Sequence, residues 1–150
     1  MCELGLKELS EILPHQSGML LLDEIKINRE EAKGKLTVRE ESCRGHIIDG
    51  RPVLRGSDLL DMAAQLLAVY TYINYPELRE RVCVVREYGK AKLKGIIVPG
   101  NVISITLGPE SVIRTGKGNF DIISGNDFVV RGIEGEMKAQ IDSVVLVVSM

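Results

Sequence analysis

The most apolar stretch of the chain runs from Ser57 to Ile73 and predicts a buried helix. Ala and Leu dominate this stretch, it contains neither Pro nor Gly, and the Ser57 hydroxyl is placed to cap its first turn. The apolar character continues almost all the way round the predicted helix, which favours a core position wrapped by other elements. Tyr75 and Pro76 are expected to end the helix.

Alternating apolar and polar positions on both sides of this helix predict strands. A short amphipathic helix over residues 3–13 is expected first, followed by two paired strands over residues 19–27 and 32–39. The strands expected after the long helix span residues 82–93 with a break near Gly89, 101–107, 112–114, 118–124, 128–132 and 134–148. The SGND stretch at residues 124–127 is interpreted as a hairpin loop, because it is rich in small polar residues.

These elements predict an α+β fold, in which one long central helix lies across one face of an antiparallel sheet. The strands after the helix are expected to follow one another as a meander, and the earlier strands to join the same sheet. The length of 150 residues suits a single domain over residues 1–150, and no repeat or linker divides it.

The charge balance and the cysteines exclude several classes of function. Nineteen Lys and Arg against 21 Asp and Glu, with no long run of either sign, give no indication of a nucleic-acid or anionic-membrane partner. The three cysteines show no paired spacing, so we expect neither a disulfide framework nor a metal site. The N-terminal segment lacks the pattern of a signal peptide, and the long helix is too short and too polar at Asp61 for a membrane span. We therefore expect a soluble, cytoplasmic protein.

Three residues around the start of the long helix are candidates for chemistry. His46 lies in the preceding loop, and histidine is the residue type suited to take or give a proton near neutral pH. Asp61 is a carboxylate that we expect to be buried, and the Gly56 amide belongs to the unsatisfied first turn. Asp61 and Gln65 are four positions apart and share a helix face. An enzyme that removes a proton beside a carbonyl and expels a neighbouring hydroxyl needs a base, an acid and an amide that polarises the carbonyl. These three residues could supply those groups.

Each candidate also has a purely structural interpretation. A loop histidine such as His46 is more often a surface or hydrogen-bonded residue than a catalytic one. Asp61 can serve the helix dipole, although Asp58 in the first turn fills that role more conventionally. Gly56 can be a simple turn residue. Cys43 lies three residues before His46, but nothing in the sequence lowers its pKa, and we discount it as a nucleophile.

Three segments of the sequence resemble one known family. GHIIDGRPVLRGSDLLDMAAQ resembles the active-site block of the bacterial 3-hydroxyacyl-[acyl-carrier-protein] dehydratases of fatty acid biosynthesis. LPHQSGMLLLDEI resembles the opening Leu-Pro-His segment of that family, and GIIVPGNVISI resembles its later Val-Pro-Gly turn and strand. Together the three segments occur in the right order and cover roughly Ile12 to Leu107.

The resemblance implies a hotdog fold and a specific division of labour among the residues. His46 would be the base at the α-carbon, and Asp61 would protonate or bind the leaving hydroxyl. The Gly56 amide would hold the thioester carbonyl, the Val53 carbonyl would orient the imidazole, and Gln65 would order Asp61. The residues that would bind or orient the substrate are Val53, Arg55, Ser57 and Gln65.

The resemblance also implies the substrate and the assembly. The substrate would be a (3R)-3-hydroxyacyl thioester of acyl carrier protein or coenzyme A, turned over without cofactor or metal to the trans-2-enoyl thioester. A homodimer, alone or within a larger oligomer, would combine the histidine of one protomer with the carboxylate of the other, and an acyl chain would lie in an apolar tunnel at their interface. Two alternatives on the same fold are an acyl thioesterase and a non-catalytic acyl-binding or assembly subunit.

The sequence departs from the pattern of that family near the predicted site. Ile47 and Ile48 replace Phe-Pro after the histidine, and the loop is one residue longer before Pro52. Arg55 replaces the Pro of the Pro-Gly step, and Asp61 stands where the commonest branch has Glu. These differences indicate a divergent member of the family. They also alter the sequence that sets the backbone geometry around the Gly56 amide.

Overall fold

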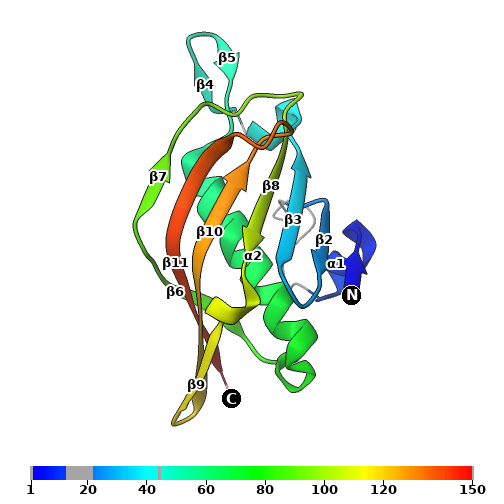
Figure 1. Cartoon of the computed structure of the whole chain (residues 1–150), viewed down its shortest axis with the longest axis vertical. Helices are drawn as coiled ribbons and strands as arrows, with labels where there is room; N and C mark the ends of the chain where they lie inside the picture. The colour runs from blue at the N-terminus through cyan, green and yellow to red at the C-terminus, as the bar shows by residue number, and fades with distance from the viewer. Residues whose placement is uncertain (1, 13–21, 44, 150) are drawn as a thin grey trace.

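The computed structural model describes residues 2–12, 22–43 and 45–149 (Figure 1). Its helices are α1 (Leu6–Ile12) and α2 (Gly56–Asn74), and its strands are β1 (Cys2–Leu4), β2 (Glu24–Ile27), β3 (Ala32–Thr37), β4 (Ile47–Ile48), β5 (Arg51–Pro52), β6 (Cys83–Tyr88), β7 (Ala91–Leu93), β8 (Val102–Leu107), β9 (Ile113–Lys117), β10 (Phe120–Arg131) and β11 (Met137–Ser149). Three short 3-10 helices are η2 (Glu40–Cys43), η3 (Pro76–Leu78) and η4 (Pro109–Ser111).

The predicted long helix is confirmed as α2, and it forms the centre of the core. Met62, Leu66, Leu67 and Val69 are completely buried on it, because the sheet covers most of its circumference. α2 begins at Gly56, one residue earlier than predicted, and its N-cap is Arg55 in an extended conformation without a capping side-chain bond. The prediction that the Ser57 hydroxyl caps the helix is therefore wrong.

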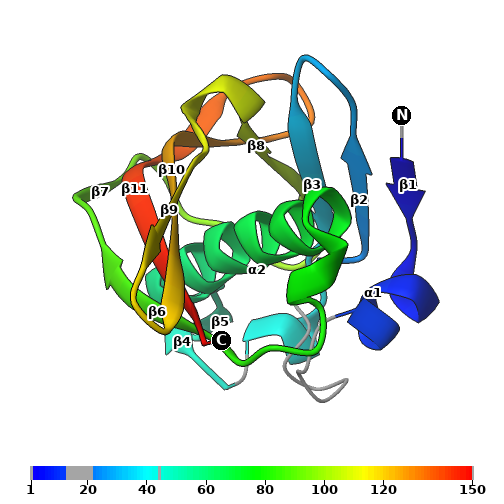
Figure 2. The same ribbon diagram turned by 90° about the horizontal axis from the view of Figure 1, so that it is seen from below.

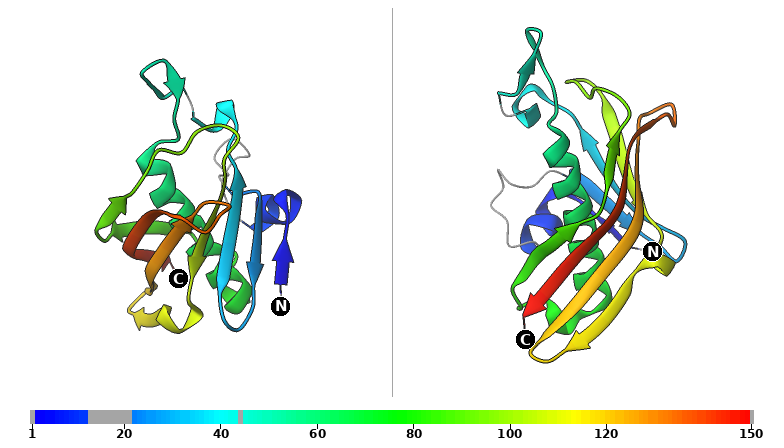
Figure 3. Two further views of the ribbon diagram at one scale, coloured as in Figure 1. Left: turned by 45° about the horizontal axis from the view of Figure 1, so that its top comes forward. Right: turned by 90° about the vertical axis from the view of Figure 1, so that its left-hand side faces the viewer.

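One curled antiparallel sheet wraps around α2 (Figures 1 and 2). Its strand order is β1-β2-β3-β8-β10-β11-β6, with β7 also paired to β11 and β9 also paired to β10. The long strands β10 and β11 cross the helix (Figure 3). Buried and less buried positions alternate along most of both strands. The predicted arrangement of one long helix against one antiparallel sheet is confirmed.

The strands after α2 do not form the predicted meander. β6 follows α2 in the chain, but it pairs with β11, the last strand, and Cys83 lies opposite Val148. After β7, the segment 94–101 returns the chain across one end of the molecule to β8, which pairs with β3. The Ile97 carbonyl accepts a hydrogen bond from the Leu54 amide at 2.8 Å, so this segment is fastened to the chain just before α2.

The prediction of a hairpin loop at SGND is also wrong, because these residues lie inside the continuous strand β10. β10 pairs with β9 as far as Ser124 and with β8 from Val129, so SGND marks the change of neighbour. Gly125 lies against α2, where an added Cβ atom would stand 3.2 Å from Leu67 Cδ1. Asp127 has a positive φ of 59°, and the buried positions of the strand change from odd to even numbers there. This segment thus allows β10 to pack closely against α2 and switches which positions of the strand are buried.

The N-terminal helix is shorter than predicted. Cys2–Leu4 forms β1, in which Leu4 lies opposite Ile25 on β2, so the first apolar residues join the sheet. The Gly5 amide donates to Glu8 Oε2 at 3.0 Å, and α1 begins only at Leu6. The predicted strand over residues 19–27 is confirmed for its second half as β2, whereas residues 19–21 lie outside the described residues.

Candidate active site

The segment before α2 folds into a small hairpin that stands off one end of the molecule (Figure 1). β4 and β5 pair through Ile47 with Pro52 and Ile48 with Arg51, and Asp49 and Gly50 turn the chain with φ angles of 50° and 77°. Ile47 and Ile48 are exposed by 59% and 43%. The departure from the family pattern at this loop is therefore a two-residue hairpin turn that presents two isoleucines to solvent.

His46 lies at the base of this hairpin and is held by Val53. The Val53 amide donates to the His46 carbonyl at 2.9 Å, and His46 Nδ1 lies 3.1 Å from the Val53 carbonyl oxygen. Because a carbonyl oxygen only accepts hydrogen bonds, Nδ1 must be the protonated nitrogen in this arrangement. In the neutral tautomer that fits this contact, Nε2 of the half-buried ring carries the lone pair that a general base needs.

The start of α2 presents free backbone amides close to this loop. Gly56 is the first helical residue, and the amides of Gly56 and Ser57 have no helical acceptor, so they are available to an anionic oxygen. The Asp58 amide already donates to the Arg55 carbonyl at 3.0 Å. The side chain of Leu93 on β7 covers Gly56, because a Cβ atom added to Gly56 would stand 2.8 Å from Leu93 Cδ1.

Asp58, and not Asp61, is the buried carboxylate of α2. Asp58 is 1% exposed and forms a two-point ion pair with Arg55, with Nη2 at 2.9 Å from Oδ1 and Nε at 3.2 Å from Oδ2. The hydrogen bond and the charge of Asp58 raise the pKa of Arg55 above its ordinary value. The Arg55 side chain, predicted to bind substrate, thus neutralises a carboxylate that would otherwise repel an oxyanion at the same helix end.

The expectation that Asp61 is buried is wrong for the single chain, in which its side chain is exposed. The physical reason is its position on the helix face towards β6, the last strand of the curled sheet, where the sheet ends. Asp61 Oδ1 accepts a hydrogen bond from the Tyr88 hydroxyl at 3.0 Å. Gln65, one turn further on, is only 4% exposed, whereas Ser57 is exposed.

Two residues that contact the candidate site, Tyr88 and Leu93, were not predicted. Both belong to the predicted segment 82–93, where a β-bulge before Tyr88 and the break at Gly89 interrupt the alternation of the side chains. Within the described part of the chain, no hydrogen bond joins His46 to Asp61. The structure therefore connects His46 with Val53 and Asp61 with Tyr88.

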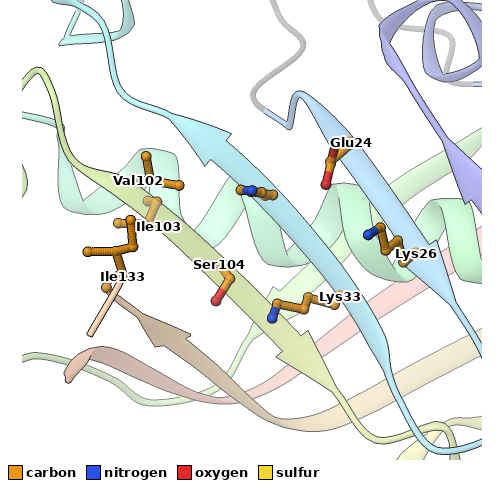
Figure 4. Close-up of a pocket in the computed structure, with 9 residues that line it drawn as sticks. Glu24, Lys26, Lys33, Val102, Ile103, Ser104 and Ile133 are labelled. Atoms are coloured by element: carbon orange, nitrogen blue, oxygen red, sulfur yellow. The ribbon is translucent and has the colours of Figure 1, made fainter. Parts of the chain in front are cut away.

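A hollow on the outer face of the sheet is separate from these residues (Figure 4). It lies over β2, β3 and β8, on the side turned away from α2, and its polar lining includes Lys26, Lys33, Lys35, Glu24 and Ser104. The lysine side chains are exposed, as expected for the solvated face of an antiparallel sheet. None of the predicted site residues lines this hollow.

The cysteines in residues 2–12, 22–43 and 45–149 are all free thiols. Burial is the main cause that raises the pKa of the Cys43 thiol, with smaller effects of the Asp58 and Glu40 charges, so the thiol is held in its protonated form. Over the same ranges, no group of three or more His, Cys, Asp or Glu residues is arranged to hold a metal ion. No helix that the structure describes has the length and hydropathy needed to cross a membrane.

Solved structures with the same fold include dehydratases and thioesterases. The dehydratase heterocomplex ApeI:P from Xenorhabdus doucetiae matches with a TM-score of 0.69 at 15% identity, covering 95% of this chain and 90% of that one. A mutant thioesterase of Pseudomonas aeruginosa matches with a TM-score of 0.66 at 17% identity, covering 97% and 94%. At these identities the likeness shows the fold alone, and the fold is the predicted hotdog fold.

Sequence similarity is more specific than the fold. No family model matches the chain. The 3-hydroxyacyl-[acyl-carrier-protein] dehydratase FabZ of Enterococcus faecalis is 33% identical over 105 residues, which cover 67% of this chain and 73% of that protein. The corresponding FabZ of Clostridium botulinum is 24% identical over 148 residues, which cover 96% of both chains. This chain is therefore a divergent member of the 3-hydroxyacyl-[acyl-carrier-protein] dehydratase FabZ family.

Proposed function

We propose that this protein dehydrates a (3R)-3-hydroxyacyl thioester of acyl carrier protein or coenzyme A to the trans-2-enoyl thioester. The observation that carries the proposal is the contact of His46 Nδ1 with the Val53 carbonyl, which leaves Nε2 free as a base beside the start of α2. Membership of the FabZ family supports the same reaction. The product would serve fatty acid or related acyl-chain biosynthesis.

The reaction assigns one proton transfer to each ionisable residue. His46 Nε2 takes the proton from C2 of the acyl chain, the electron pair of that bond forms the C2=C3 double bond, and the C3–O bond breaks. Asp61 gives a proton to the departing hydroxyl, which leaves as water. Exchange with solvent then restores the protonation states of His46 and Asp61.

The start of α2 stabilises the charge that develops on the thioester carbonyl oxygen. In this proposal the Gly56 amide, at the first position of α2, donates to this oxygen, and the dipole of α2 favours its negative charge. Arg55 keeps the nearby Asp58 carboxylate neutralised and, with Ser57, borders the approach of the substrate. Gln65 orders the helix face on which Asp61 lies.

A second copy of the chain completes the site in this proposal. One edge of β6 has no partner strand among the described residues, and its Val84 is 54% exposed. Asp61 lies on the side of α2 that faces β6, so a twin chain paired at that edge would cover Asp61 and supply its own His46. Exposed apolar side chains at this end of the molecule, Leu93 and Ile96, offer surface to an acyl chain.

Hydration of crotonyl thioester by the purified protein tests the proposal directly, because loss of the enoyl absorbance reports the reverse reaction. We expect activity in the wild type and a loss of at least 100-fold in both His46→Ala and Asp61→Asn, the usual range for a general acid or base. Asp142→Asn changes an exposed carboxylate on β11 and is the matched control for Asp61→Asn. Full activity in both site variants would refute the assignments.

The alternatives give different results in the same experiment. A thioesterase would release free thiol from an acyl thioester without forming an enoyl product. A non-catalytic subunit would bind the acyl thioester tightly and turn over nothing. Either outcome would contradict the proposed dehydration.

A further inference from the structure

The Tyr88 hydroxyl is placed to control the carboxylate of Asp61. It donates to Asp61 Oδ1 at 3.0 Å from a different element, strand β6, across 27 positions of sequence. Asp61 Oδ2 has no hydrogen-bond partner within the described residues. One carboxylate oxygen is therefore fixed by the protein, and the other is open.

A β-bulge in β6 is what turns Tyr88 towards α2. Cys83, Val85 and Tyr88 pair with Val148, Leu146 and Val144 of β11, which are all buried on the inner face of the sheet. Directly paired residues point to the same side of a sheet, so these three residues of β6 face inwards. The spacing from Val85 to Tyr88 is three positions instead of two, and the register of the pairing shifts at this point.

Without the extra residue, Tyr88 would point away from the helix. Side chains of a regular strand alternate, so an inward Val85 would place Glu87 inwards and Tyr88 outwards. Arg86 is the additional residue, and it reverses the alternation just before Tyr88. Bulges of this kind frequently re-aim a side chain beside a functional site.

Tyr88 acts as a hydrogen-bond donor throughout the physiological pH range. Burial, and then the hydrogen bond and charge of Asp61, hold the pKa of Tyr88 far above its ordinary value. The Asp61 carboxylate also interacts electrostatically with the Arg55 guanidinium. The hydroxyl therefore keeps its proton and presents it to the carboxylate.

We propose that Tyr88 is a positioning residue for Asp61: it occupies Oδ1 and aims Oδ2 at the hydroxyl that leaves the substrate. This inference rests on the proposed dehydratase function. When Asp61 gives up its proton, the hydrogen bond from Tyr88 becomes a bond to a charged acceptor and strengthens. The stabilisation grows during the chemical step, so it belongs mainly to kcat and less to KM.

The test combines Tyr88→Phe with Asp61→Asn. In Tyr88→Phe the ring that packs against the core remains and only the hydroxyl is removed. We expect kcat for dehydration of a 3-hydroxybutyryl thioester, the direction in which Asp61 gives up its proton, to fall roughly tenfold with KM nearly unchanged, about the effect of one hydrogen bond to a charged group. Tyr75→Phe, the same change at the far end of α2, should leave kcat unchanged.

The double variant separates a role through Asp61 from a general structural role. If Tyr88 acts through Asp61, Tyr88→Phe should cost nothing further in the Asp61→Asn background. An unchanged kcat in Tyr88→Phe, or equal losses in both backgrounds, would overturn the inference while the activity of the wild type upholds the proposed function. A wild type without hydratase activity would instead refute the proposed function itself. Thermal unfolding of each variant verifies that the fold is intact.

Discussion

The replacement Gly56→Ala should reduce catalysis while leaving the fold almost unchanged. Gly56 is the first residue of α2, and its φ lies outside the left-handed region, so alanine fits the backbone. The added methyl group would stand 2.8 Å from Leu93 Cδ1, the end of a flexible side chain that is 57% exposed. Leu93 must therefore change rotamer, and the methyl group would cover the amide that we assign to the thioester carbonyl.

The opposing contributions to stability nearly cancel. Alanine is favoured over glycine by up to about 1 kcal/mol in a helix, and by less in the first turn. A strained or displaced Leu93 rotamer costs about 0.5–1.5 kcal/mol. We expect the free energy of unfolding to stay within about 1 kcal/mol of the wild type, which is a shift in Tm of about 4 °C or less for a chain of this size.

The effect on the rate should be much larger than the effect on stability. Loss of one oxyanion donor typically costs about 100-fold to 1000-fold in kcat. We expect kcat/KM for crotonyl thioester hydration to fall towards this range in Gly56→Ala. Gly95→Ala is the control, because a Cβ atom there meets nothing closer than 3.8 Å. It should change neither Tm nor activity.

A second variant decides which contact matters. In the double variant Gly56→Ala/Leu93→Ala the contact with Leu93 is removed, and the rate should stay low because the methyl group itself covers the amide. Recovery of the rate in the double variant would assign the effect to Leu93. A kcat/KM within twofold of the wild type in Gly56→Ala would refute the oxyanion assignment.

Three further predictions concern the fold. Phe128→Ala should lower the free energy of unfolding by about 3–5 kcal/mol in urea denaturation, because Phe128 is fully buried, and Phe120→Ala, at a 37% exposed position, should cost less than half as much. Asp127→Gly should raise the free energy of unfolding by about 1 kcal/mol, since glycine adopts the φ of 59° without strain; a decrease would contradict the positive φ at this position. The hydrogen bond from Arg114 lowers the pKa of Glu77, so it stabilises the fold above the ordinary carboxyl value of 4.5. The Tm difference between wild type and Glu77→Gln should therefore be present at pH 7 and disappear as pH falls below the lowered pKa.

The central helix and most strands were predictable from local patterns. A long run of apolar residues without a helix breaker predicts α2, and the strict alternation of buried and less buried side chains is typical of a strand such as β8. The errors arose where tertiary contacts override local chemistry. Gly125 and Asp127 are residue types typical of a turn, yet both lie inside β10, a strand of twelve residues. Gly125 leaves room for α2, and at Asp127 the buried positions of the strand change from odd to even numbers.

The site was only partly predictable for a related reason. His46, Gly56 and Asp61 could be proposed from residue type, position and family resemblance, because all three belong to one contiguous segment. Tyr88 could not be found in this way, since its direction depends on one extra residue in β6 and on the register against β11. The ion pair between Arg55 and Asp58 was not predicted either, because Arg55 was expected to bind substrate and Asp58 to interact with the helix dipole.

The position of β11 between its neighbours makes the order of synthesis important. β11 pairs with β10 on one edge and with β6 and β7 on the other, and Val148 lies opposite Cys83, 65 positions earlier in the chain. While a ribosome is still making residues 137–149, β6 and β7 have no neighbour to bind, and Tyr88 is not yet fixed beside α2. A nascent chain interrupted there would keep its core helix partly bare, so folding must await nearly the whole of the domain, and such long-range pairing is slow.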